Sequence, residues 1–193
     1  MGYKHKVEDI INTGMELIRK NGYHNVGINQ ILKEAKLPKG SFYNFFSSKE
    51  DFAVTILNQY GENAKETITS FLTNQDLTPL ERLKSFYRML VEANEEDKYA
   101  GGCLINTVSN EVGRNIDKIG ETANDNFVQW LEVIGACIKE GQEAGEITTA
   151  YSPIALAEYI HAGLYGTFPR MKVTRTRDYL DRWYQMTFDF ISL

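Results

Sequence analysis

Apolar residues recur at helical spacing along nearly the whole chain, and this periodicity limits the possible folds more than any other feature. Near the start, Val7, Ile10, Ile11, Leu17 and Ile18 follow the i, i+3, i+4, i+7 pattern of a buried helix face. No segment of useful length alternates apolar and polar residues with the period of two that a half-buried strand requires. The pattern therefore predicts an all-α protein of about nine helices.

Turn and capping residues separate the predicted helices. Gly22 suits the left-handed conformation that ends the first helix. Thr78-Pro79 and Ser152-Pro153 each open a later helix, because a hydroxyl caps the first turn and proline fits its first position. We find no internal repeat and no low-complexity segment in the sequence.

Charge is unevenly distributed along the 193 residues, although the net charge is only −5. Residues 1–50 carry eight Lys/Arg against five acids, whereas residues 51–193 carry thirteen against twenty-one. A basic head and an acidic body fit a chain that meets a polyanion through its head. The sequence has neither an apolar leader nor a run of about eighteen apolar residues, so we expect a cytoplasmic protein without membrane contact.

Segment 27–46 has the spacing of a helix-turn-helix, with helices predicted at 28–35 and 38–45. Phe42 and Phe46, four residues apart, are expected to point inward. The remaining small and polar side chains could then reach phosphates and base edges. The predicted DNA-binding residues are Asn29, Lys39, Gly40, Ser41, Tyr43, Asn44 and Lys49. The alternative is that this short aromatic helix is ordinary core.

The stretch GINQILKEAKLPKGSFYNFFSSKEDF resembles the helix-turn-helix of the tetracycline-repressor (TetR) family of transcriptional regulators. The matching residues are Ile28, Ile31, Ala35, Lys39, Gly40, Ser41, Tyr43, Phe46, Ser48, Lys49 and Glu50. The resemblance implies a homodimeric repressor whose heads, residues 1–50, bind a palindromic operator in double-stranded DNA. It implies that the bodies, residues 51–193, bind a small-molecule inducer and dimerise. Lys36 departs from the family pattern, which has glycine in the turn.

The resemblance places the inducer among the middle helices of the body. The predicted pocket residues are Tyr60, Phe86, Tyr87, Leu90, Cys103, Leu104, Thr107, Phe127, Trp130 and Ile134. The same apolar and aromatic types also fill ordinary protein core, so composition leaves both readings open.

Segment 99–112, YAGGCLINTVSNEV, resembles the Gly-Cys-Leu-x-x-Asn segment of a TetR subgroup that includes the N-ethylmaleimide-reductase repressor (NemR-like proteins). In that subgroup the cysteine senses electrophiles or oxidants. If Cys103 lies in the first turn of a helix, the helix dipole and backbone N–H groups favour its thiolate. The alternative is a buried structural cysteine, which is what we expect of Cys137.

The last two helices are predicted to form the dimer, because they combine small residues with aromatic ones. The predicted interface residues are Ala157, His161, Leu164, Trp183, Tyr184 and Phe188. The alternative is that this face packs within the chain.

Chemistry other than binding finds little support in the sequence. His5, His24 and His161 are scattered and have no ligand partners at metal-binding spacing, so we expect no metal and no cofactor. No catalytic triad or phosphate-binding glycine loop is present, so we expect no enzyme. The prediction is a TetR-type repressor released by an inducer or by modification of Cys103. The rival is a helical small-molecule carrier that does not use DNA, which the basic head disfavours.

Overall fold

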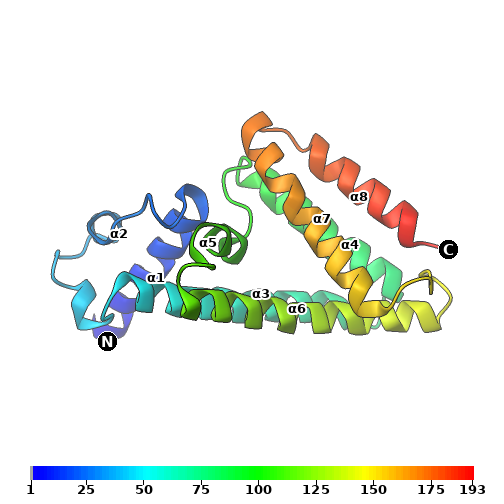
Figure 1. The fold of residues 1–193 in the computed structure, drawn as a ribbon, viewed down its shortest axis with the longest axis horizontal. Coiled ribbons are helices and arrows are strands. Elements are labelled where there is room, and N and C mark those ends of the chain that lie inside the picture. Colours follow the sequence, from blue (N-terminus) through cyan, green and yellow to red (C-terminus); the bar gives the residue numbers. More distant parts are fainter. Residues whose placement is uncertain (1) are drawn as a thin grey trace. The chain divides into compact units, whose positions relative to one another are not determined.

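The computed structural model describes the backbone of residues 2–193 and the side chains of residues 7–193. This part of the chain forms eight α-helices and one 3-10 helix and has no strand (Figure 1), which confirms the predicted all-α class. It divides into two compact units. The first unit comprises Met1–Glu62 and Gly101–Asn126, and the second comprises Asn63–Ala100 and Phe127–Leu193.

The first unit is built around the N-terminal helices. Its elements are α1 (Gly2–Asn21), α2 (Ile28–Glu34), the 3-10 helix η1 (Phe42–Asn44), the start of α3 (Lys49–Leu72), α5 (Leu104–Val112) and the start of α6 (Asp117–Glu143). Three aromatic rings form its core: Phe42, Phe46 and Phe52 lie with ring centroids 4.9–5.4 Å apart. The inward orientation predicted for Phe42 and Phe46 is confirmed, since both are buried.

Helix ends in this unit follow the capping residues. Gly22 adopts φ +89°, and its N–H donates to the Ile18 carbonyl at 2.8 Å, which closes α1. Ser48 caps α3 by accepting a hydrogen bond from the Asp51 N–H at 3.0 Å. Gly27 begins α2 in an extended conformation and has no side chain with which to cap it.

The predicted second helix of the helix-turn-helix is wrong in extent. Residues 38–45 do not form an α-helix; the chain turns through a Ser41 N–H to Pro38 carbonyl bond of 2.9 Å and then forms only η1. Gly40 and Ser41 are poor helix formers, and the segment is too short to propagate a helix by itself. Packing of Phe42 and Phe46 against Phe52 holds the segment instead.

The turn after α2 keeps a left-handed residue without glycine. Lys36 adopts φ +57°, and its neighbours close the turn with a Leu37 N–H to Leu32 carbonyl bond of 2.9 Å. A side chain in this conformation costs about 1–2 kcal/mol. The departure from the family pattern is therefore accommodated without losing the turn.

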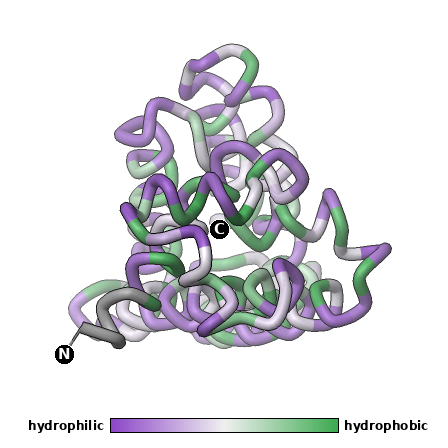
Figure 2. Tube along the Cα trace, turned by 90° about the vertical axis from the view of Figure 1, so that its left-hand side faces the viewer, coloured by the Kyte–Doolittle hydropathy of each residue, from purple (hydrophilic) through white to green (hydrophobic). Residues whose placement is uncertain are grey.

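The second unit contains α4 (Pro79–Glu96), α7 (Pro153–Thr174) and α8 (Asp178–Ile191), together with the ends of α3 and α6. Helices α7 and α8 run side by side, and α4 packs against α8 (Figure 1). Hydrophobic and hydrophilic positions follow one another along the helices (Figure 2), as expected of amphipathic segments.

The predicted helix starts in the second unit are confirmed. Thr78 and Glu81 form a reciprocal capping box at the start of α4. Ser152 accepts a hydrogen bond from the Ala155 N–H at 3.3 Å at the start of α7.

A buried arginine fixes the loop that precedes α4. Arg82 donates to the carbonyls of Asn74, Leu77 and Leu72 and pairs with the Glu140 carboxylate at 2.7 Å. Burying a guanidinium is tolerated when its donors are satisfied in this way.

The two compact units do not coincide with the predicted segments 1–50 and 51–193. Helix α3 is continuous across residue 50, and α5 belongs to the same unit as α1 and α2. The assignment of DNA binding to residues 1–50 and of ligand binding and dimerisation to residues 51–193 stays a prediction about function.

Candidate functional site

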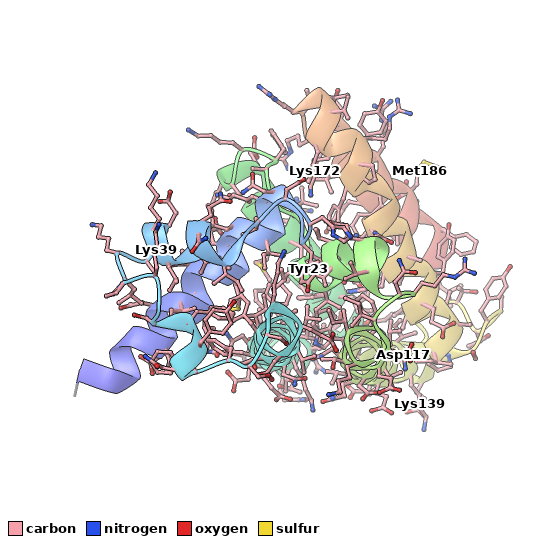
Figure 3. The ribbon with its side chains drawn as sticks, turned by 60° about the vertical axis from the view of Figure 1, so that its left-hand side comes forward. Tyr23, Lys39, Asp117, Lys139, Lys172 and Met186 are labelled. Atoms are coloured by element: carbon pink, nitrogen blue, oxygen red, sulfur yellow. The ribbon has the colours of Figure 1, made fainter. Side chains whose placement is uncertain are left out.

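The candidate DNA-binding face consists of the exposed polar residues around the helix-turn-helix. Lys39 extends outward from the loop that follows α2 (Figure 3). Tyr43 is 66% exposed although its ring lies edge-on to the buried Phe42 ring, with centroids 5.5 Å apart. The other exposed or partly exposed members of the predicted set are Asn29, Gly40, Ser41 and Asn44. The aromatic core therefore presents these groups to solvent from a rigid base.

Lys49 differs from the other predicted DNA contacts because it already has a partner in the first unit. Its ammonium donates to the Tyr23 carbonyl and lies 4.1 Å from the centre of the Tyr23 ring. Burial lowers the pKa of Lys49, and the charge of Glu111 opposes that shift. A contact from Lys49 to DNA phosphate stays a prediction.

Sequence reasoning missed Glu111, which lies on α5 and contacts the turn between α1 and α2. Its carboxylate accepts hydrogen bonds from the backbone N–H groups of Tyr23 and His24 at 3.0 and 2.9 Å. No local pattern signals this contact, because the partners are 87–88 residues apart in the chain.

Cys103 immediately precedes α5 and occupies its N-cap position, without a capping hydrogen bond from its side chain. The prediction that it lies at a helix start is therefore close to the structure. The side chain is buried. Burial raises the pKa of the Tyr60 phenol, and the neighbouring Cys103 side chain raises it further. Leu104 is buried beside them, and Thr107 donates its backbone N–H to the Cys103 carbonyl at 3.0 Å. Four of the predicted pocket residues thus gather in the first unit.

A second group of predicted pocket residues gathers around His161 in the second unit. The Tyr87 hydroxyl lies 3.2 Å from His161 Nδ1, and the Tyr165 hydroxyl lies 2.9 Å from Nε2. The Trp130 ring lies edge-on to His161, and Phe127 contacts both Trp130 and Tyr165. Burial lowers the pKa of His161 to about 4, so the imidazole is neutral at pH 7.

The remaining predicted pocket residues of the second unit lie in or near its core. Phe86 is buried, with its ring 4.9 Å from that of Tyr87, and Ile134 is fully buried. Leu90 is partly exposed. Cys137 is buried as expected, and burial raises the pKa of its thiol to about 12.

The predicted dimer residues all lie in the second unit, and their place in a dimer interface stays a prediction. Ala157, His161, Leu164 and Phe188 are buried within the single chain and leave almost no surface for a partner. Trp183 packs against Gly163 and Tyr87. The Tyr184 hydroxyl donates to the Lys84 carbonyl at 3.1 Å.

The exposed side of α7 and α8 carries other apolar side chains. These are Ile154, Tyr159, Val173, Met186 and Phe190, with Tyr151 and Leu193 at the helix ends. Tyr159 and Phe190 contact one another across the two helices, with ring centroids 5.6 Å apart.

In the part of the chain that the structure describes, no group of three or more His, Cys, Asp or Glu side chains is arranged to hold a metal ion. None of the described helices combines the length and the apolar character needed to span a bilayer.

The chain is all-helical and presents polar residues of the helix-turn-helix segment over an aromatic core, which are the features of a helix-turn-helix regulator. Family comparisons agree: residues 10–56 match the family of bacterial regulatory proteins called tetR, and residues 79–187 match the tetracyclin repressor-like C-terminal domain. The chain belongs to the TetR family and is a DNA-binding transcriptional regulator.

Several characterised relatives are repressors or regulators. The chain is 31% identical to the transcriptional repressor DhaR of Mycobacterium sp. strain GP1 over 94% of its length and 90% of that protein. It is 31% identical to the transcriptional regulator AcuR of Cereibacter sphaeroides over 86% of its length and 76% of that protein. Identity to the repressor NemR of Escherichia coli K12 is 24% over 90% of the chain and 87% of NemR. The NemR-like subgroup therefore has weaker support than the family.

Solved structures of TetR-family regulators have the same fold as this chain. A regulatory protein TetR from Rhodobacter sphaeroides superposes with a TM-score of 0.90 at 29% identity, covering 95% of this chain and 97% of that one. The reduced form of Escherichia coli NemR superposes with a TM-score of 0.85 at 23% identity, covering 97% of each chain.

Proposed function

We propose that this regulator is a cytoplasmic, non-enzymatic repressor that binds a palindromic operator as a homodimer and is released by a small-molecule inducer. The observation that carries the DNA-binding part is the exposed polar set around Lys39 and Tyr43, held over buried Phe42 and Phe46. Short polar and cationic groups on a rigid base are suited to phosphate and base contacts.

DNA binding is tested by fluorescence anisotropy on the DNA immediately upstream of the protein's own gene, at several salt concentrations. Lys39→Ala should weaken binding and reduce the salt slope by about one, because one phosphate contact is lost. Lys118→Ala is the matched control, since Lys118 is also an exposed lysine and lies on α6. If affinity depends on salt concentration equally in both variants, Lys39 does not contact the DNA. A wild-type protein without salt-dependent, sequence-specific binding would favour the carrier function instead.

Cys103 supplies one proposed route of release. In this route the thiolate adds to the carbon–carbon double bond of an electrophile such as N-ethylmaleimide; an S–C bond forms and the adjacent carbon takes up a proton. The position of Cys103 at the start of α5, against Tyr60, supports the proposal, because an adduct there would disturb the α5 packing.

We expect N-ethylmaleimide to release the wild-type protein from its DNA and to leave Cys103→Ser bound. Cys137→Ser is the matched control and should be released like the wild type, because burial raises the pKa of Cys137 and keeps its thiol protonated. If Cys103→Ser is released as readily as the wild type, the cysteine route is wrong.

The cluster around His161 supports a second, reversible route. Tyr87, His161 and Tyr165 provide polar groups within an aromatic surround, the composition typical of small-molecule sites. An inducer that still releases Cys103→Ser would act by this route.

A further inference from the structure

The turn between α1 and α2 has a backbone arrangement suited to one carboxylate. Helix α1 closes at Gly22, and the N–H groups of Tyr23 and His24 then both point toward Glu111 of α5. Tyr23 donates to Oε1 and His24 donates to Oε2, so each carboxylate oxygen accepts one hydrogen bond. Consecutive N–H groups that converge in this way form an anion-binding concavity.

Gly22 is required for this contact in two ways. Its φ of +89° is one that side-chain-bearing residues rarely adopt. A Cβ at this position would also lie 2.3 Å from Glu111 Oε1. The absence of a side chain is therefore what allows the carboxylate to reach the turn.

Helix α3 holds the same turn through the backbone carbonyl of Tyr23. Lys49 donates to the Tyr23 carbonyl and packs on the Tyr23 ring. Tyr23 is buried and lies close to α5 (Figure 3). The turn is thus fixed by an anion from α5 and a cation from α3, and charge-assisted hydrogen bonds of this kind are stronger than neutral ones.

Helix α5 links this contact to the surroundings of Cys103. Its nine residues, Leu104–Val112, span about 13 Å at 1.5 Å per residue. Cys103 precedes one end beside Tyr60, and Glu111 lies in the last turn at the other. Arg19 of α1 also makes a long hydrogen bond, 3.5 Å, to the Gly102 carbonyl. Both ends of α5 are therefore tied to elements of the head.

We propose that Glu111 is a positioning residue that sets the operator-binding orientation of the helix-turn-helix by holding the α1–α2 turn to α5. The inference rests on the proposed DNA-binding function and deepens it. A displacement of α5 moves the Glu111 carboxylate, and the turn and α2 move with it. Glu111 touches no DNA in this proposal; it acts through the backbone of Tyr23 and His24.

The test compares wild type, Glu111→Gln and Glu121→Gln. Glutamine keeps the size but loses the charge and one of the two acceptor oxygens. Glu121 is an exposed acid on α6 and controls for the change in net charge. Three quantities are measured: amide hydrogen exchange at Tyr23 and His24, the melting temperature, and affinity for the gene's own upstream DNA and for a random fragment of equal length.

We expect faster exchange at Tyr23 and His24 in Glu111→Gln and a loss of about tenfold in affinity for the upstream DNA, within the range of typical site-to-site coupling. Affinity for the random fragment should stay unchanged, because a positioning role affects only the specific geometry. The melting temperature should fall by a few degrees at most, because one hydrogen-bond acceptor is lost and the rest of the fold is intact. Glu121→Gln should match the wild type in all three measurements.

Two results would overturn the proposal and can be told apart. If exchange accelerates but specific affinity is unchanged, Glu111 does not position the head, and the DNA-binding function stands. If the wild type itself shows no preference for the upstream DNA, the proposed function fails, and this inference fails with it. Should Glu111→Gln not fold, Glu111→Asp keeps the charge but shortens the reach. It should then show the same specific loss in smaller measure, and wild-type affinity for this variant would count against the proposal.

Discussion

At the scale of single residues, His161 makes the stability of the second unit depend on pH. Burial lowers the pKa of its imidazole to about 4, against 6.5 for an exposed histidine. The unfolded chain therefore binds a proton between pH 6.5 and 4 that the folded chain does not. The contribution of the neutral His161 to the free energy of unfolding is complete above pH 6.5 and is lost progressively as the pH falls toward 4.

We expect the free energy of unfolding to fall by about 3 kcal/mol through His161 alone between pH 7 and pH 4, at ~1.4 kcal/mol for each pKa unit. Urea titrations at several pH values measure how the free energy of unfolding changes with pH. His161→Gln should make this change smaller, whereas His24→Gln, which replaces an exposed histidine, should not. Parallel slopes for the wild type and His161→Gln would show that the buried imidazole is not responsible.

At the scale of elements, the start of α4 depends on a local capping box. The Thr78 hydroxyl accepts from the Glu81 N–H, and the Glu81 carboxylate accepts from the Thr78 N–H at 2.9 Å. Two backbone donors that the helix cannot satisfy internally thereby find partners.

Thr78→Ala should lower the free energy of unfolding by about 1 kcal/mol, because one of these donors loses its acceptor. Thermal or urea unfolding measures the change. Thr67→Ala is the control: Thr67 is an exposed threonine inside α3, where loss of the hydroxyl should cost less than about 0.5 kcal/mol. Equal losses for the two variants would mean that the cap contributes nothing beyond an ordinary surface threonine.

At the scale of the whole molecule, we propose that the exposed apolar side chains of α7 and α8 form the dimer face. Phe190 is 48% exposed and contacts Tyr159, which is 56% exposed; Met186 on the same helix is 70% exposed. Aromatic and Met side chains are enriched at protein interfaces. A two-fold contact through this face would pair two heads on one palindromic operator.

Phe190→Asp should convert the dimer to a monomer, because it places a charge in the apolar centre of the contact. Light scattering after size-exclusion chromatography measures the mass. Val128→Asp introduces the same charge at a comparably exposed apolar residue on α6, 45% exposed, and should leave the dimer intact. A dimeric Phe190→Asp protein would place the interface elsewhere.

Much of the architecture could be predicted from local sequence. Helical periodicity predicts the α class, and the caps at Thr78 and Ser152 predict where helices begin. These signals are local, because neighbours on a helix surface are three or four residues apart. Phe42 and Phe46 point inward as predicted, although the α-helix assumed in that prediction does not form.

Other features depended on tertiary structure, because they join residues far apart in the chain. Helix α7 carries apolar residues on several sides, so its sequence does not reveal which side is inner. Packing within the second unit buries Ala157 and Leu164 and leaves Tyr159 exposed. Residues 38–45 are too weak in helix propensity to form the predicted helix, and aromatic packing against Phe52 on α3 holds the 3-10 turn in its place.

The sequence by itself determined the helical class, the family and the polar face of the helix-turn-helix, since each is recorded in short-range spacing. Only the tertiary structure decided which groups meet across long separations. It brings the Glu111 carboxylate to a turn 87–88 residues earlier and places the Tyr87 hydroxyl, 74 residues away in the chain, against His161. The reason is physical: a buried hydrogen bond or charge is stable only with a matching partner, and packing of the helices chooses that partner.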